Sequence, residues 1–226
     1  MENLNSISLL FNRIYHFLFI ERFRKKLTFN FPQEIFRWHL LQYIIDKYDY
    51  KNYLEIGCDQ DQSFSKIIID NKVGVDPVSG GTIRNTSDNF FINNKEKFDI
   101  IFIDGLHHYE QVIKDIYNAL KILNENGHIL VHDCLPRTIA HQARPRYRGS
   151  WNGDVWKSIA ELRTKKYLEV FTCEIDFGIG VIRKRNNLNP IKIDTDDFKK
   201  LKFKDYFYKN KEFMNIVFYD QTLKII

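Results

Sequence analysis

The sequence has few of the residues that mark stapled, repetitive or unfolded chains. Among 226 residues there are only 3 cysteines, 5 prolines and 10 glycines. The cysteines, Cys58, Cys134 and Cys173, are odd in number and far apart, which argues against a disulfide framework and a paired-cysteine zinc site. We therefore expect a reducing, cytoplasmic setting. The low proline and glycine content excludes collagen-like and linker-like chains.

The excess of one charge is also small. Lys and Arg number 34 against 29 Asp and Glu, which gives a net charge of +5. This charge suits an anionic ligand but does not call for nucleic acid. With 44% apolar and 28% charged residues the chain is of ordinary globular composition, so wholesale disorder is excluded. The length predicts one domain with extensions.

No hydrophobic run is long enough for a membrane span of about 20 residues. The apolar stretch 7–20 is interrupted by Asn12, Arg13 and His16, it is closed by the charged segment 21–26, and no small-residue cleavage site marks a signal peptide. Its apolar residues recur at helical spacing: Ile7, Leu10, Phe11, Ile14, Phe17 and Leu18. The spacing predicts an amphipathic helix. Packing on its own domain or on a partner subunit is favoured, and a helix lying on a membrane surface is the alternative.

Apolar runs and helical patterns alternate through the middle of the chain. Predicted strands cover 53–56, 73–75, 98–103, 128–131, 168–173 and 179–182, and predicted helices cover 36–48, 63–69, 107–123 and 153–162. Gly127 is expected to end the third of these helices in a left-handed conformation. The alternation predicts an α/β domain with a mostly parallel sheet, and ligands of such sheets bind at the carboxyl ends of the strands.

The first predicted strand ends at a glycine turn. Glu55, Gly57 and Cys58 form the turn, and Asp76 ends the next strand about 20 residues later, where an acidic residue binds ribose hydroxyls. The turn also carries Asp59 and a second aspartate, Asp61, whose charges would repel a pyrophosphate. The local chemistry therefore favours S-adenosylmethionine, and an NAD-dependent enzyme is the alternative.

Acidic residues also end the two strands that follow. Asp104, with His107 close behind it, follows one strand, and Asp133 follows the other. If these strands are neighbours, the two carboxylates converge and can hold Mg²⁺, and the imidazole can take a proton from a hydroxyl. Capping of the following helix is an alternative role for Asp104. Asp115, further along that helix, is expected to face solvent.

The loop 134–152 is expected to overhang this edge of the sheet. Its arginines can clamp a phosphate or carboxylate, although a solvated loop is the alternative: Arg137, Arg144, Arg146 and Arg148. Trp151 can stack on a sugar face. Asp154 is expected to be the N-cap of the next helix.

Five segments together resemble a known family. YLEIGC, VGVDPVSGGT, FDIIFIDGLHHYEQVIKDI, GHILVHDC and WNGDVWKSI are similar to class I S-adenosylmethionine-dependent methyltransferases. More narrowly, they resemble a small bacterial group associated with surface-polysaccharide and natural-product O-methylation. The resemblance implies a Rossmann-like methyltransferase fold over 35–185, with helices on both faces, between an N-terminal helical extension, 1–34, and a C-terminal extension, 186–226.

The resemblance also implies roles for individual residues. Glu55 to Gly57 would line the methionine end of the cofactor, Asp76 would bind the ribose, and Ser87 and Asp88 would lie near the adenine. His107, Asp104 and Asp133 would be catalytic, with His107 as the base. Asp104 would also contact the cofactor, and Asp104 and Asp133 would hold the metal. We expect methyl transfer to a hydroxyl of a small, anionic sugar, sugar nucleotide or glycan precursor, with Mg²⁺ as a candidate metal and a homo-oligomer as a candidate assembly. A non-catalytic glycan-binding or nucleic-acid-binding module on the same fold is a further alternative.

Three positions depart from the family pattern. Asp61 stands where the family carries its last glycine of the turn. His132 stands where metal-binding relatives carry a second acid. The short segment 77–81 leaves little room for a crossover before a third strand, so that strand is expected to be degenerate or absent.

Overall fold

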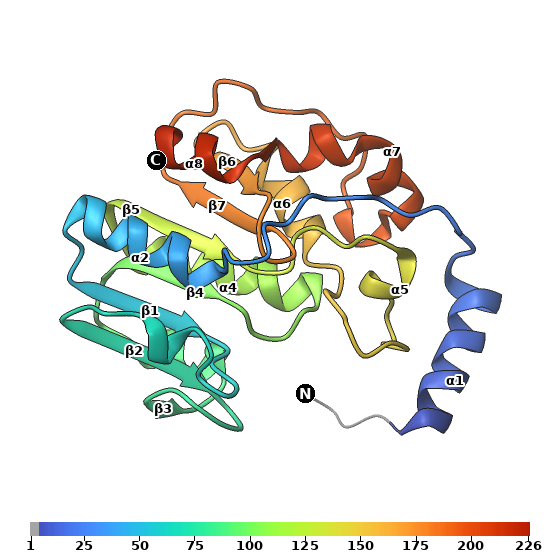
Figure 1. The fold of residues 1–226 in the computed structure, drawn as a ribbon, viewed down its shortest axis with the longest axis horizontal. Helices are drawn as coiled ribbons and strands as arrows, with labels where there is room; N and C mark the ends of the chain where they lie inside the picture. The colour runs from blue at the N-terminus through green and yellow to red at the C-terminus, as the bar shows by residue number, and fades with distance from the viewer. Residues whose placement is uncertain (1–4) are drawn as a thin grey trace.

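One sheet organises the chain (Figure 1). The computed structural model describes residues 5–226, and residues 1–4 of the expected N-terminal extension lie outside that range. Within the described residues the sheet has eight strands in the order β3-β2-β1-β4-β5-β7-β6-β8. The strands are β1 (Asn52–Ile56), β2 (Asn71–Asp76), β3 (Ile83–Arg84), β4 (Phe98–Ile103), β5 (Leu123–Val131), β6 (Glu169–Cys173), β7 (Ile179–Arg183) and β8 (Ile216–Val217).

The strands from β3 to β5 run parallel, and β7 lies antiparallel between β5 and β6. The last strand, β8, comes from the C-terminal extension and pairs parallel with β6. This arrangement confirms the predicted α/β class with a mostly parallel sheet. It also places the carboxyl ends of β1, β2, β4 and β5 along one edge, where the motif residues stand.

Helices cover both faces of the sheet (Figure 1). The α-helices are α1 (Ser6–Tyr15), α2 (Arg37–Tyr48), α3 (Ser87–Asn93), α4 (Tyr109–Ile122), α5 (Ile139–Gln142), α6 (Trp156–Leu162), α7 (Phe203–Met214) and α8 (Tyr219–Ile225). Strand residues alternate between the two cores: Leu54 and Ile101 pack with Ile116 of α4 and Trp156 of α6, on the face that α7 also covers. Their neighbours Tyr53, Ile100 and Phe102 pack with Leu41 and Ile44 of α2 on the other face.

The predicted helix over 63–69 is wrong. Only a 3₁₀ turn, Phe64–Lys66, follows β1. The ammonium of Lys72 donates to the carbonyls of Phe64 (2.9 Å) and Ile67 (3.0 Å), and Gln42 accepts from the amide of Ile68 (2.8 Å). These side chains from α2 and β2 take the backbone groups that a helix would have used, so tertiary contacts override the local pattern.

Two further expectations concern segment ends. The third strand is present but degenerate, since β3 has two residues and reaches β2 through a short turn without a helix. The expected helix stop at Gly127 is wrong, because α4 ends at Ile122 and leads directly into β5, which contains Gly127. The left-handed residue there is Asn126, with φ of 63°.

The predicted N-terminal helix forms, as α1 followed by a π-helical turn, His16–Ile20. Its apolar face does not pack on the chain's own domain, because no residue of α1 is buried, and packing on a partner subunit stays a prediction. None of the helices within residues 5–226 combines the length and the apolar character that a membrane crossing needs.

Candidate functional site

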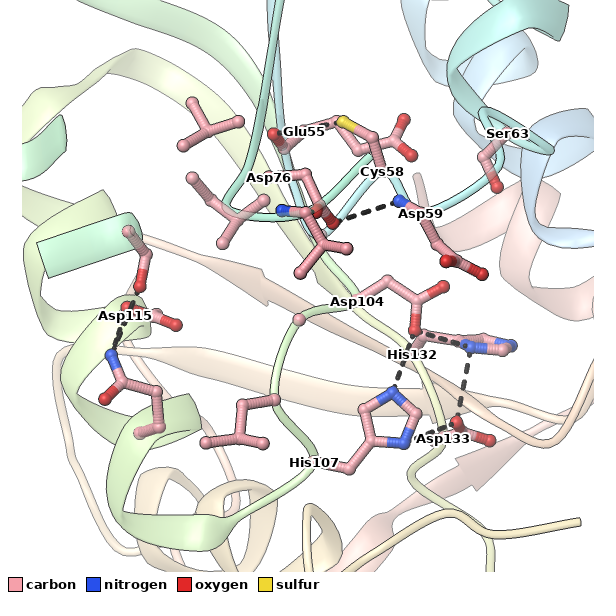
Figure 2. A pocket seen from close by; sticks show the side chains of 18 of the residues that line it. Glu55, Cys58, Asp59, Ser63, Asp76, Asp104, His107, Asp115, His132 and Asp133 are labelled. Atoms are coloured by element: carbon pink, nitrogen blue, oxygen red, sulfur yellow. Dashed lines mark hydrogen bonds and ion pairs between the residues drawn. The ribbon is translucent and has the colours of Figure 1, made fainter. Parts of the chain in front are cut away.

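A cavity of about 660 Å³ lies at the carboxyl edge of the sheet (Figure 2). The ends of β1, β2, β4 and β5 line it, together with residues from α2 and α4 and the segment 149–151. The predicted cofactor turn and the predicted acid–histidine group both face this one cavity. Its volume is in the range of small-molecule and cofactor sites.

The turn after β1 depends on Gly57, whose φ is +89°. A Cβ there would lie 2.4 Å from the carbonyl oxygen of Asp104 and 2.5 Å from Cα of Gly105. Such contacts admit no side chain, and the positive φ disfavours one as well. Gly57 therefore lets the turn after β1 press against the turn after β4, which brings the two motifs together.

Asp76 ends β2 and organises the loop beyond it. Its carboxylate accepts from the amides of Asp59 (3.0 Å), Val78 (2.7 Å) and Ser79 (2.9 Å). Burial would raise the pKa of Asp76, but these amides and the nearby Arg84 outweigh it and lower the pKa. Asp76 is thus a fixed anion in the cavity wall, which is the chemistry that suits ribose hydroxyls.

Asp61 replaces the family's glycine for a structural reason. It adopts φ of 58°, the left-handed region that a glycine would also take. Its carboxylate accepts from the amide of Gly81 at 2.7 Å, so it fastens the Gly80–Gly81 turn to the first motif. Asp59, by contrast, lines the cavity.

Glu55 lies almost fully buried beneath the glycine turn and lines the cavity. The hydroxyl of Tyr53 donates to its carboxylate. Burial raises the pKa of Glu55 to about 8. A largely protonated carboxyl there can donate a hydrogen bond to a ligand.

A polar group from α3 and α4 lines the far side of the cavity. The amide of Gln111 donates to Ser87 (3.2 Å), Asp88 (3.1 Å) and Asp115 (3.0 Å). The expectation that Asp115 faces solvent is wrong, because α3 packs over that face of α4 and leaves Asp115 1% exposed. Burial raises the pKa of Asp115 to about 6. Helical phase alone gave no signal for this, since the covering helix comes from elsewhere in the chain.

Asp104, His107 and Asp133 converge at the other end of the cavity (Figure 2). β4 pairs with β5 in a register that sets Ile103 beside Val131, so the residues after each strand are neighbours. The imidazole of His107 places Nε2 3.3 Å from Oδ1 of Asp104 and Nδ1 3.2 Å from Oδ2 of Asp133. The predicted convergence of the three side chains is therefore present in the structure.

Three further residues complete this group: His132, which the sequence had marked only as a departure from the family pattern, and Arg37 and Asp176, which it did not indicate. His132 places Nδ1 3.0 Å from Oδ1 of Asp104 and Nε2 2.8 Å from the carbonyl of Asp176. Arg37, at the start of α2, contacts Asp176 at 2.9 Å and Asp104 at 3.6 Å. Arg37 and Asp176 are far from the motifs in sequence, and only the folded chain brings them to the cavity.

Charges in this group support one another. Burial opposes ionisation of Asp104, but His132 and His107 outweigh it and hold the pKa of Asp104 well below its ordinary value. Burial likewise opposes protonation of the histidines, yet Asp104 and Asp133 raise the pKa of both His107 and His132. Burial raises the pKa of Asp133. The carboxylates of this group therefore favour the protonated form of both imidazoles.

The same residues fit a divalent cation. Asp104, His107 and Asp133 each offer one ligand atom, and these atoms lie within 4.8 Å of one another. Two carboxylates suit hard ions such as Mg²⁺, and an imidazole extends the choice to ions such as Mn²⁺. Because the same carboxylates raise the pKa of His107, a metal bound there would compete with protonation of its imidazole.

Asn152 holds Asp133, and Asp154 holds the start of α4. The amide of Asn152 donates to Asp133 at 2.7 Å. The expected capping of the helix after residue 155 by Asp154 is wrong: Asp154 accepts from the amide of Tyr109 at 2.8 Å and so caps α4. The alternative capping role of Asp104 is therefore filled by Asp154.

The arginine loop meets the cavity only at its end. Trp151 lines the cavity and stacks on His107, with ring centroids 5.5 Å apart. Arg144 pairs with Glu110 at 2.5 Å and Asp154 at 3.2 Å, so its charge serves the loop's own anchoring. None of the predicted substrate-binding arginines lines the cavity within the described chain. Arg137 packs over Phe31, and Arg146 lies over Trp151. Arg148 directly precedes the lining residues 149–151 in the chain, and its carbonyl accepts from Arg146.

The comparisons with known proteins agree with this geometry. Residues 45–134, which include both motifs, match the family model described as a methyltransferase domain. No curated protein matches the sequence. Solved structures that are similar in fold include an S-adenosylhomocysteine-bound methyltransferase of Podospora anserina, PaMTH1, at 17% identity, covering 66% of this chain and 78% of that one with a TM-score of 0.51.

Two solved O-methyltransferase structures are also similar in fold, each at 12% identity. The Bacillus cereus enzyme bound to S-adenosylhomocysteine shares 12% identity, with 79% and 90% of the two chains covered and a TM-score of 0.50. TomG of Streptomyces achromogenes, bound to S-adenosylmethionine, also shares 12% identity, with 82% and 92% covered and a TM-score of 0.50. The fold is that of class I methyltransferases. The match to the methyltransferase-domain model spans residues 45–134 of this fold.

Proposed function

We propose that the protein transfers the methyl group of S-adenosylmethionine to a hydroxyl of a small acceptor. The observation that carries this proposal is the single cavity in which the Gly57–Asp76 side meets the Asp104–His107–Asp133 group. A cofactor bound along the first side would end beside the second. The NAD alternative finds less support, because Asp59 lines the cavity next to the turn where a pyrophosphate would lie.

The places of several residues in the cavity support their assignment to the cofactor. Gly57 opens the turn, Asp76 offers its carboxylate to the ribose hydroxyls, and Glu55 and Asp104 border the methionine end. Ser87 and Asp88 border the adenine end, and Asp115 joins them there. When bound, S-adenosylmethionine supplies an electrophilic methyl group on a sulfonium.

The group at the acceptor end of the cavity would accept the proton of the acceptor hydroxyl. His107 stands between two carboxylates that orient its ring, and the neutral imidazole takes the proton of the attacking hydroxyl. Trp151 stacks on this ring and fixes its tilt. A divalent ion held by Asp104, Asp133 and His107 would instead lower the pKa of the acceptor hydroxyl. Most of the catalytic effect would come from positioning the two reactants.

We further propose an anionic sugar or glycan precursor as the acceptor. The loop that carries Arg146 and Arg148 continues into Gly149, Ser150 and Trp151, which line the cavity. The exposed Arg148 supports this proposal, while the guanidinium of Arg146 donates to the carbonyls of Arg148 and Gly149 and shapes the loop. Arg144 is engaged with Glu110 and Asp154. The three free cysteines suit the cytoplasmic setting proposed for such an enzyme.

Transfer of a labelled methyl group tests the proposal. The protein is incubated with methyl-labelled S-adenosylmethionine and a panel of sugar nucleotides, neutral sugars and catechols, and product is counted with the wild type and with His107→Gln. Methylation of a sugar nucleotide that His107→Gln loses supports the proposal. Stoichiometric cofactor binding without turnover on any hydroxyl would favour the non-catalytic binding module, and methylation of catechols alone would refute the sugar acceptor.

A further inference from the structure

The N-terminal helix presents an apolar face that the rest of the chain leaves uncovered. α1 and the π-helical turn after it run without a break from Ser6 to Ile20. In Figure 1 α1 stands at the edge of the molecule, apart from the sheet. Six of its exposed apolar residues recur at helical spacing, and we call them the outer stripe: Ile7 (66% exposed), Leu10 (57%), Phe11 (67%), Ile14 (47%), Phe17 (47%) and Leu18 (51%). Tyr15, Phe19 and Ile20 are exposed beside it. An exposed stripe of this kind is a mark of an interaction surface.

The opposite side of this helix is fastened to the body of the protein. The side-chain amide of Asn12 donates to the carbonyl of Arg146 at 2.8 Å. His16 is buried, and its ring lies 5.4 Å from that of Tyr147. These contacts fix the helix against the loop before Trp151, with the outer stripe turned away from it. The exposed face is therefore held in place by the fold.

The charges within and directly after the outer stripe are mainly positive. Residues 6–20 contain no Asp or Glu, and Arg13 is their charged residue. The segment that follows carries Arg22, Arg24, Lys25 and Lys26. Its one acid, Glu21, accepts from the amides that begin α7, those of Phe203 (2.9 Å) and Lys204 (2.8 Å). The helix thus offers an apolar face bordered by cations.

This combination distinguishes between possible occupants. A second copy of the chain could cover the stripe, but its own residues 6–20 contain no acidic side chain to pair with the basic segment. An anionic lipid surface offers hydrocarbon to the stripe and phosphates to the cations, as it does for other amphipathic basic helices. Charge complementarity therefore favours the lipid.

We propose that α1 and the turn after it lie in the surface of an anionic lipid bilayer, with the outer stripe in the acyl region and the basic segment at the headgroups. The contacts of Asn12 and His16 join this helix to the loop whose end lines the cavity. Docking would hold the cavity close to the bilayer surface, where an acceptor attached to or concentrated at the membrane would be met.

Vesicle co-sedimentation tests the proposal with the full chain. The protein is mixed with vesicles of phosphatidylcholine alone or of equal parts phosphatidylcholine and phosphatidylglycerol. At low salt we expect the wild type to pellet with the mixed, anionic vesicles and not with phosphatidylcholine alone. We expect Leu10→Ser/Phe11→Ser/Leu18→Ser to bind the anionic vesicles at least about tenfold more weakly. The matched control is Ile92→Ser/Leu188→Ser, which removes side chains that are 79% and 93% exposed elsewhere.

A second pair of variants tests the charge. Arg24→Gln/Lys26→Gln, both exposed positions, should weaken binding to the anionic vesicles severalfold and leave any residual binding to neutral vesicles unchanged. Sedimentation equilibrium without lipid is run in parallel. A dimer that the outer-stripe variant dissociates, with no vesicle binding by the wild type, would overturn the proposal in favour of a second copy. Vesicle binding that the outer-stripe variant retains would overturn it as well. Methyl transfer to an acceptor free in solution should be unchanged in all these variants, which separates this test from that of the proposed function.

Discussion

The two ends of the cavity are built in different ways. At the cofactor end, Asp76 is held by backbone amides of its own and the preceding turn, and Gly57 is fixed by close approach of two backbones. At the acceptor end, His107 and Asp104 are held by side chains from separate parts of the chain, including Arg37. The cofactor end is formed by short stretches of backbone, whereas the acceptor end forms only when elements far apart in the chain pack together.

This difference predicts separable effects. Changes at the cofactor end should alter the affinity for the cofactor, because backbone geometry there does not depend on the charged group. Changes at the acceptor end should alter kcat, because the group that handles the proton has no part in holding the adenosine.

Replacing the histidine at the acceptor end should have the largest effect. We expect His107→Gln to lower kcat by about 10²–10⁴-fold, since a positioned proton acceptor contributes that much. The dissociation constant of S-adenosylhomocysteine, measured by calorimetry, should be unchanged. His108→Gln is the control, because His108 does not line the cavity. Equal losses in both variants would mean that His107 has only a structural part.

Replacing the carboxylate at the cofactor end should act on binding alone. We expect Asp76→Asn to raise the dissociation constant of S-adenosylhomocysteine by about 10–100-fold, as hydrogen bonds to a charged group are worth about 1.5–3 kcal/mol. At saturating cofactor, kcat should stay near that of the wild type. The exposed Asp70→Asn serves as the comparison. Unchanged affinity in a folded Asp76→Asn protein contradicts the assignment to the ribose.

The pH profile should report the acceptor end. Burial opposes protonation of His107, but Asp133 and Asp104 outweigh it and raise its pKa above the ordinary value. A base must be neutral to act, so kcat should rise with pH until the pH passes this raised pKa. Below it, kcat should fall about tenfold per pH unit. A profile with its rising limb below the ordinary histidine range would show that another group takes the proton.

The arginine loop should give the smallest effect. Arg146→Gln/Arg148→Gln should raise the KM for an anionic acceptor by a few fold, because exposed charge pairs contribute about 0.2–1 kcal/mol. Salt should diminish the difference, and both the cofactor affinity and kcat should be unchanged. An acceptor KM indifferent to the two substitutions and to salt would leave the arginines without a part in acceptor binding.

The same contrast explains what the sequence could predict. The strands, the glycine turn and the acidic strand ends are local patterns, and they lie where the patterns placed them. The helix expected over 63–69 is absent, because Lys72 and Gln42 bind its backbone groups. The burial of Asp115 and the contact of Arg37 with Asp104 depend on packing between elements far apart in the chain. No pattern within one segment contains that information.

Calorimetric titration with S-adenosylhomocysteine tests the central claim most directly. The account predicts that one molecule binds per chain of the wild type, that Asp76→Asn binds more weakly and His107→Gln equally well, and that NAD⁺ gives no binding heat. Absence of S-adenosylhomocysteine binding by the folded wild type, or binding of NAD⁺ in its place, would contradict it.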